Sequence, residues 1–190
     1  DVVYKMGIGS GTSIPLPYTY RQVPLETSNP FIHHDMNLCI VCGRCVRACN
    51  ELEGVDAITF INRGDRTVIG TSFGGSLAES GCTYCGVCVD VCPVGAIVEK
   101  DSKWSGSPDH EVPSVCADCS IGCGLQLQVK GRKFLRSFFR AEGASDGQTC
   151  VKGKFGAGFV NSSKRLLSPM VRKDGQLVEA TWDEALETVA

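Results

Sequence analysis

The sequence lacks a long apolar run, and it has no excess of either charge. Among 190 residues, 19 basic side chains nearly balance 21 acidic ones, and no stretch is long and apolar enough to predict a membrane-spanning helix. The basic residues are scattered along the chain, so a nucleic-acid-binding surface is not indicated. We therefore expect protein partners and no membrane span.

The sequence also lacks a spare cysteine. All 12 cysteines fall into three groups of four, which leaves none for a disulfide or a catalytic thiol. This distribution favours a reducing compartment, and we expect a cytoplasmic protein. Because the chain begins with Asp1 and ends inside a predicted helix, we expect a piece of a longer polypeptide, with a removed signal peptide as an open alternative.

The first two cysteine groups repeat one spacing, C-x2-C-x2-C-x3-C, at a shift of 43 residues, with Gly43 superposed on Gly86 and Pro93 closing the second run. Three cysteines on a tight loop can reach three corners of one cubane, and in two-cluster ferredoxins the fourth ligates the other cluster. We therefore predict two neighbouring [4Fe–4S] clusters. The predicted ligands are Cys39, Cys42, Cys45 and Cys92 for one cluster, and Cys82, Cys85, Cys88 and Cys49 for the other.

Other roles for these cysteines are less favoured. Zinc sites use pairs of C-x2-C with a longer spacer, and a disulfide framework does not need a repeated register. His33 and His34 precede the first group, and a histidine can ligate a cluster. No cysteine precedes Cys39 to complete such a ligand set, so we expect both histidines at the surface.

The segments around the two groups have turn-rich compositions. Residues 1–30 predict an extended arm, anchored by Tyr4, Tyr18 and Tyr20, with an inert linker as the alternative. Within a ferredoxin-like domain at 31–100, the runs 57–61 and 66–71 flank a turn and predict an inserted β-hairpin. Residues 101–110 are polar and predict a linker.

The third group has a different spacing. Cys116, Cys119 and Cys123 follow C-x2-C-x3-C, and Cys150 comes after 26 further residues. This pattern predicts a third [4Fe–4S] cluster with all four ligands in one small domain at 111–165, with structural zinc as the alternative. Alternating apolar residues between 124 and 138 predict a β-hairpin that covers the cluster.

The third group and the residues after it resemble a known family. Cys116-x2-Cys119-x3-Cys123-x26-Cys150-Val151-Lys152-Gly153 resembles the N-terminal cluster domain of molybdopterin-dependent oxidoreductases. Residues 165–172 and 180–186 resemble the start of that family's large catalytic region, here 166–190. Thr181 and Glu184 also predict a capping box for a helix beginning near Trp182, and Gly175 a turn before it. With two ferredoxin-type clusters in front, the domain order is most similar to the catalytic (alpha) subunit of an NAD- or ferredoxin-linked formate dehydrogenase.

The resemblance implies an α+β fold made of a ferredoxin-like 2[4Fe–4S] domain, a small and mainly β [4Fe–4S] domain, and the start of a truncated catalytic domain. It implies molybdenum or tungsten on bis(molybdopterin guanine dinucleotide) in the full-length protein, and formate or CO2 as substrate. It also implies partner subunits that bind flavin and NAD or belong to a hydrogenase, with further iron–sulfur clusters, and ferredoxin. No catalytic residue lies within these 190 positions.

The resemblance also places Lys152 between the third cluster and the pterin, as a cofactor-binding residue. Lys154 and Arg172 are weaker candidates for contacts with the pterin phosphates. Two other functions stay open. One is a non-catalytic electron conduit in a hydrogenase- or NADH dehydrogenase-type complex. The NADH dehydrogenase type is less favoured, because the chain has two tandem four-cysteine runs and no histidine-ligated cluster. The other is a structural metal-binding scaffold.

Overall fold

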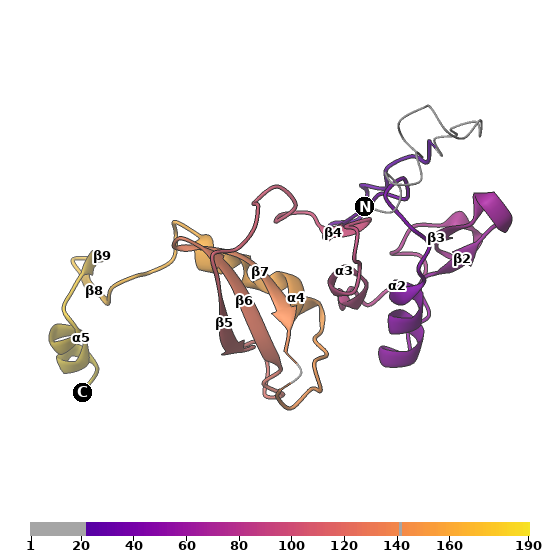
Figure 1. Ribbon diagram of the computed structural model, residues 1–190. Helices are drawn as coiled ribbons and strands as arrows, with labels where there is room; N and C mark the ends of the chain where they lie inside the picture. The colour runs from indigo at the N-terminus through magenta and orange to yellow at the C-terminus, as the bar shows by residue number, and fades with distance from the viewer. Residues whose placement is uncertain (1–21, 141) are drawn as a thin grey trace.

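The computed structural model describes residues 22–140 and 142–190. The predicted tyrosine anchors of the N-terminal arm lie outside the described residues. Figure 1 shows three parts in a row: a part with the short strands β1–β4, a part built on the sheet β5–β7, and a last part that holds α5. The first and second parts are in contact, whereas the third stands apart in both views.

The first part consists of two small antiparallel strand pairs and two short helices. β1 (Ile32–His34) pairs with β4 (Ile97–Glu99), so the beginning and the end of the cysteine repeat meet in one sheet. β2 (Thr59–Ile61) pairs with β3 (Val68–Gly70), which confirms the predicted hairpin. The remaining elements are α2 (Arg44–Arg47), the π-helical turn η1 (Ala48–Leu52), the 3-10 turns η2 (Gly64–Arg66) and η3 (Ser72–Gly74), and α3 (Val87–Asp90).

The two cysteine loops share one backbone conformation. Val41 and Tyr84 are related by the 43-residue shift, and both have a positive φ, of 55° and 56°. Gly43 and Gly86 are related in the same way, with φ of 71° and 80°, and each begins a short helix. Left-handed residues turn the chain sharply, and the repeated turns give both loops the same course around their cysteines.

The core of the first part combines aliphatic side chains with cysteines. Its buried residues come from β1, β3 and β4, from α2 and η1, and from the segments between the elements: Ile32, Met36, Cys45, Cys49, Ala57, Ile58, Ile69, Leu77, Ala96 and Ile97. Four more cysteines, Cys39, Cys82, Cys88 and Cys92, are partly buried against it. Six of the eight cysteines of the first two groups therefore lie in or against this core, and Cys42 and Cys85 do not.

The second part is a three-stranded antiparallel sheet in the order β5-β6-β7, made of β5 (His110–Val115), β6 (Gly124–Lys130) and β7 (Lys133–Phe139). The pairing of β6 with β7 confirms the predicted hairpin. β5 was not predicted, because its sequence has little apolar alternation and contains Pro113. Proline is tolerated in a strand at the edge of a sheet, and β5 occupies an edge.

A helical segment packs against β7. It consists of α4 (Val151–Phe155) and the 3-10 segment η4 (Gly156–Asn161). The fully buried Ser137 on β7 donates its Oγ hydrogen bond to the carbonyls of Gly153 at 2.7 Å and Lys154 at 2.8 Å. Phe134 and Asn161 exchange two further hydrogen bonds. Both ends of the segment are thereby fixed to the sheet.

The last part is a hairpin followed by a helix: β8 (Met170–Lys173), β9 (Gln176–Glu179) and α5 (Trp182–Val189). Gly175 has a φ of 83° in the turn, and Thr181 accepts the Glu184 backbone N–H at 3.2 Å, so the predicted turn and helix start are confirmed. The Glu184 carboxylate pairs with Lys173 at 2.5 Å rather than closing the capping box. In the described part of the chain, no helix combines the length and apolar character needed to cross a membrane.

Candidate iron–sulfur sites

The first pocket brings together Cys39, Cys42, Cys45 and Cys92. Its walls are apolar and include Met36, Ile69, Ala96 and Ile97. Burial raises the pKa of Cys45 to about 11, and the neighbouring Cys39, Cys92 and Cys42 add to the increase. Cys92 therefore lies beside the three cysteines of the first loop, although it belongs to the second run in sequence.

The second set of thiols mirrors the first. Burial raises the pKa of Cys88 well above its ordinary value, with further contributions from Cys85, Cys82, Cys45 and Cys49. Cys49 also contributes to the raised pKa of Cys82, after burial as the main cause. Cys49 therefore lies close enough to Cys82 and Cys88 to affect both thiols. The influence of Cys45 on Cys88 shows that the two sets are adjacent.

Backbone N–H groups point at matching sulfurs in the two loops. Val41 donates to Cys39 Sγ at 3.3 Å, and Tyr84 donates to Cys82 Sγ at 3.4 Å. Such hydrogen bonds favour the thiolate over the thiol, and around an iron–sulfur cluster they adjust its reduction potential. The two residues with a left-handed conformation, Val41 and Tyr84, are thus the residues whose backbone N–H groups donate to sulfur.

The donor set fits iron–sulfur clusters. A buried thiol is costly to ionise, and a coordinated metal offsets that cost because the metal binds the deprotonated sulfur. Soft thiolate ligands suit both iron–sulfur clusters and zinc, and the repeated x2-x2-x3 spacing of the first two groups is the one found in two-cluster ferredoxins. All 12 cysteines are free thiols.

The third group lies at the boundary of the first and second parts. Cys119, Cys123 and Cys150 line one pocket, and Cys85 and Glu53 from the first part line the same pocket. Cys116 is linked to this set because its backbone N–H donates to the Cys123 carbonyl at 2.9 Å. The third group therefore opens directly beside the second set of thiols.

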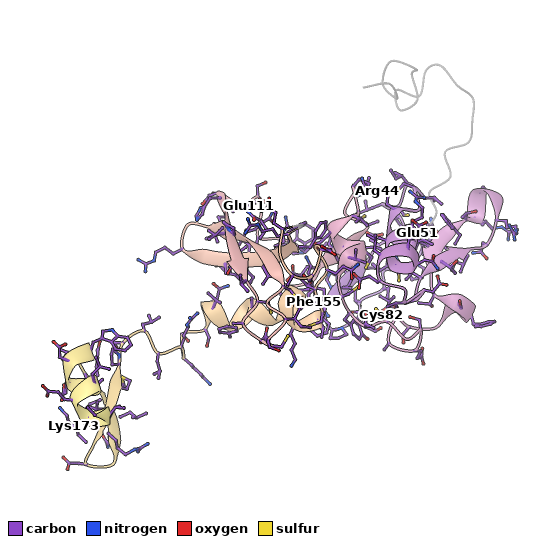
Figure 2. All side chains as sticks on the ribbon, turned by 90° about the horizontal axis from the view of Figure 1, so that it is seen from below. Arg44, Glu51, Cys82, Glu111, Phe155 and Lys173 are labelled. Carbon is purple, nitrogen blue, oxygen red and sulfur yellow. The ribbon has the colours of Figure 1, made fainter. Side chains whose placement is uncertain are left out.

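Other contacts hold this boundary in place. Gln148, two residues before Cys150, donates to the Leu52 carbonyl at 2.8 Å. Phe155 of α4 stacks on Phe31 with ring centroids 4.9 Å apart and an interplanar angle of 14°, and Tyr84 meets Phe31 edge-on at 5.5 Å. Figure 2 shows Phe155 at the junction of the two parts.

The predicted lysines lie in different surroundings. Lys152 is exposed and lines a pocket with Cys116, Asp118 and Phe159. Lys154 is only 2% exposed, and its ammonium group pairs with Asp90 of α3. The prediction that Lys154 contacts pterin phosphates is therefore wrong, because its charge is already paired inside the protein. Arg172 donates to the Gly175 carbonyl at 2.7 Å within its own hairpin.

The expectation of surface histidines is wrong for His34. It lies in β1 with its side chain buried, and its backbone exchanges hydrogen bonds with Glu26 at 3.0 and 3.1 Å. Desolvation lowers its pKa. The prediction failed because β1 is only three residues long and its strand pattern is set by pairing with β4, some 60 residues later in sequence.

Sequence reasoning also missed Glu53, Asp90 and Glu99. The repeat does single out Asp90, because the 43-residue shift aligns Asp90 in the second half with Arg47 in the first half. A reversal of charge between two otherwise matching halves of a repeat indicates a contact that only one half makes. In the structure that contact is the ion pair with Lys154.

Glu99 predicts a pH dependence of stability. Burial raises its pKa to about 7, although the charges of Lys154 and Arg136 and a hydrogen bond from Ser102 act in the opposite direction, with Asp101 adding to the increase. A carboxyl group with a folded pKa above its unfolded pKa of 4.5 binds protons more tightly in the folded state. Its contribution to the free energy of unfolding therefore falls as the pH rises from about 4.5 to about 7.

We expect Glu99→Gln to remove this fall. The variant should be more stable than the native protein at pH 8 and lose that advantage at pH 5. The difference in free energy of unfolding between the two proteins should change by roughly 3 kcal/mol at most between these pH values. Thermal unfolding midpoints of the cluster-loaded protein at both pH values measure it. An equal pH dependence of the two proteins would contradict the prediction.

Comparisons with known proteins find a family match for each of the three parts. Residues 29–98 match the ferredoxin-like domain of NADH-quinone oxidoreductase subunit 3, residues 109–162 the molybdopterin oxidoreductase Fe4S4 domain, and residues 165–190 the molybdopterin oxidoreductase model. The last two matches cover the third cysteine group and the part that follows it.

Relatives carry several names. An NADH-quinone oxidoreductase subunit of Rhizobium meliloti (strain 1021) is 38% identical over 97% of this chain and 22% of its own length. The alpha subunit of an NADPH-Fe(3+) oxidoreductase of Geobacter sulfurreducens (strain DL-1 / KN400) is 37% identical over 85% of this chain and 18% of its own. The "Putative formate dehydrogenase" of Staphylococcus aureus (strain USA300) is 30% identical over 91% of this chain and 22% of its own.

The chain thus spans about a fifth of the length of these curated relatives. A solved NAD+-reducing [NiFe]-hydrogenase is similar at 28% identity over 55% of this chain and 44% of that chain, with a TM-score of 0.45. The chain therefore carries, in this order, a ferredoxin-like domain of the NADH-quinone oxidoreductase type, a molybdopterin oxidoreductase Fe4S4 domain and a segment that matches the molybdopterin oxidoreductase model.

Proposed function

We propose that this chain is the electron-transfer segment of a molybdenum or tungsten bis-pterin enzyme resembling formate dehydrogenase, and that it holds three [4Fe–4S] clusters. The observation that carries the proposal is the continuous series of thiol sets. The third set shares a pocket with Cys85, and Cys88 of the second set lies within electrostatic range of Cys45 in the first. A series of this kind suits electron transfer better than a structural metal site, which needs no neighbour.

The residues divide into three ligand sets. They are Cys39, Cys42, Cys45 and Cys92; Cys82, Cys85, Cys88 and Cys49; and Cys116, Cys119, Cys123 and Cys150. When bound, the clusters take up and release electrons, at potentials set by burial, charge and hydrogen bonds to sulfur. The proximities of Cys92 to the first loop and of Cys49 to the second support the crossed assignment.

The series has a direction in space. The second set is the neighbour of the third, and the first set is the far end, where the Cys42 side chain is exposed. We infer that the pterin site adjoins the third set and that partner redox subunits, such as flavin- and NAD-binding or hydrogenase subunits or ferredoxin, adjoin the first. Formate oxidation or CO2 reduction is supported by the domain order and by the name of the Staphylococcus aureus relative.

Lys152 is proposed to lie between the third set and the pterin, because it is exposed and lines the same pocket as Cys116. Its cation stabilises the more negative, reduced state of a nearby cluster. We expect Lys152→Ala to lower the midpoint potential of the third cluster and to slow substrate-driven reduction of the other two, with all clusters still assembled. Redox titration followed by EPR measures the potential, and an unchanged potential would contradict this role.

The proposed function is tested by composition of the natively purified full-length protein. Three [4Fe–4S] clusters predict about 12 Fe per chain, accompanied by molybdenum or tungsten and a releasable pterin. Zinc in place of iron would refute electron transfer and support a structural scaffold. Activity is then assayed with formate and an artificial electron acceptor.

A second candidate is an electron conduit without a catalytic metal. It is favoured by the names of two relatives, an NADH-quinone oxidoreductase subunit and an NADPH-Fe(3+) oxidoreductase subunit. The same measurement separates the candidates, since the conduit predicts about 12 Fe and neither molybdenum, tungsten nor pterin.

A further inference from the structure

Lys154 occupies an unusual place at the junction of the first and second parts. Its side chain is 1% exposed, and that of its partner Asp90 is 3% exposed. The ammonium group donates to the Asp90 carboxylate and to the Ser137 carbonyl at 2.6 Å, and it lies 4.5 Å from the centre of the Phe138 ring. Lys154 and Asp90 come from different cysteine modules, so one buried ion pair joins them.

The aliphatic part of the same side chain fills a gap that only glycine leaves open. A Cβ on Gly86 would lie 2.5 Å from Lys154 Cγ and 3.0 Å from its Cδ and Cε. Gly86 stands inside the second cysteine loop, between Cys85 and Cys88. The side chain of Lys154 is thus pressed against the loop that carries three ligands of the second set.

The backbone of Lys154 is also held in place by hydrogen bonds. Its carbonyl accepts a hydrogen bond from Ser137 Oγ, and its backbone N–H donates to the Cys150 carbonyl at 3.1 Å. Cys150 is a proposed ligand of the third set. A single residue therefore connects a ligand of the third cluster, through its backbone, with the ligand loop of the second cluster, through its side chain.

Energetics favour a role in positioning rather than in stability. Removing two charges from water has a high cost in free energy, and the pairing repays that cost only when the geometry is good. Apolar side chains at both positions would fill the same space without this cost. A buried pair does, however, accept only one relative placement of its two carriers, because any shift leaves an unpaired buried charge.

We propose that Lys154 is a positioning residue that locks the third cysteine group against the second through Asp90, Gly86 and Ser137, and so fixes the separation of the two clusters. This inference rests on the proposed electron-transfer function. The rate of transfer between two clusters depends steeply on their separation, so a lock at this junction controls the step between the two modules.

The test is Lys154→Met in the cluster-loaded full-length protein, because methionine retains much of the volume and removes the charge. We expect unchanged iron content, loss of the magnetic interaction between the second and third clusters in EPR spectra of the reduced protein, and faster amide hydrogen exchange in α3 and α4. The control is Lys173→Met, which removes an exposed lysine paired with Glu184 and should change none of these.

The double variant Lys154→Met with Asp90→Asn separates locking from simple destabilisation. If the single variant fails only because it leaves Asp90 unpaired, the double variant will regain the magnetic interaction, and the inference is wrong. Retention of the interaction in the single variant is equally decisive against it. A native protein that has three clusters but no interaction between any of them would instead refute the proposed electron path.

Discussion

Replacing Cys49 with alanine is expected to remove the cluster of the second loop and to leave the cluster of the first loop, in which Cys49 stands by sequence, intact. Cys49 contributes to the raised pKa of both Cys82 and Cys88, whereas Cys45 of its own run contributes only at Cys88. Alanine cannot coordinate iron, so the cluster of the second loop would keep only three of its four thiolate ligands, and we expect it to be lost. Iron should fall from about 12 to about 8 atoms per chain.

Double variants identify which cluster is lost. Cys49→Ala combined with Cys85→Ala should still lose one cluster, whereas Cys49→Ala combined with Cys42→Ala should lose two and leave about 4 Fe. Cys92→Ala is the matched control. Combined with Cys42→Ala it should lose one cluster, and combined with Cys85→Ala it should lose two. Iron analysis and EPR difference spectra measure the outcome. The reverse pattern would show that each run of four cysteines ligates its own cluster.

The second large effect is expected from Gly86→Ala, and Gly43→Ala serves as its internal control. Both glycines have a left-handed φ, of 80° and 71°, so alanine costs each site about 1–2 kcal/mol in the backbone. The added methyl groups meet different neighbours. At Gly43 the contact is Phe60 Cζ at 2.6 Å, on a ring that is 45% exposed and can move aside. At Gly86 it is the buried and doubly bonded Lys154.

We therefore expect Gly86→Ala to cost a further 1–3 kcal/mol for overpacking. At 2–4 °C per kcal/mol for a chain of this size, its unfolding midpoint should lie roughly 2–12 °C below that of Gly43→Ala. Differential scanning calorimetry of the cluster-loaded variants measures the difference. Equal losses at the two sites would mean that Lys154 can be displaced, and would weaken its proposed role as a lock.

The cysteine groups could be predicted from the sequence because their spacing is local chemistry. Ligands within a C-x2-C-x2-C loop must lie on one short turn, and the 43-residue repeat extends that reasoning to the second loop. Hairpins such as β2–β3 and β6–β7 were predictable for a similar reason, since they depend on a turn and on alternation in neighbouring residues. The start of α5 was predictable from the cap at Thr181.

Contacts between distant segments were not predictable. The pairing of β1 with β4 buries His34, and β5 forms only because β6 offers an edge that tolerates Pro113. Lys154 looked like a free cation two residues beyond Lys152, and the charge reversal at Asp90 was the single mark of its partner in the sequence. Their meeting across 64 residues depends on how α4 docks beside α3.

By itself the sequence determined the three groups of four cysteines, the residues that form each loop, and the resemblance to molybdopterin oxidoreductases. These properties follow from spacings of two and three residues that any fold of the chain must respect. The tertiary structure alone decided that the third group adjoins the second rather than the first, and that a buried lysine joins them. Burial, desolvation and charge pairing arise only when separate segments pack together, so no local pattern records them.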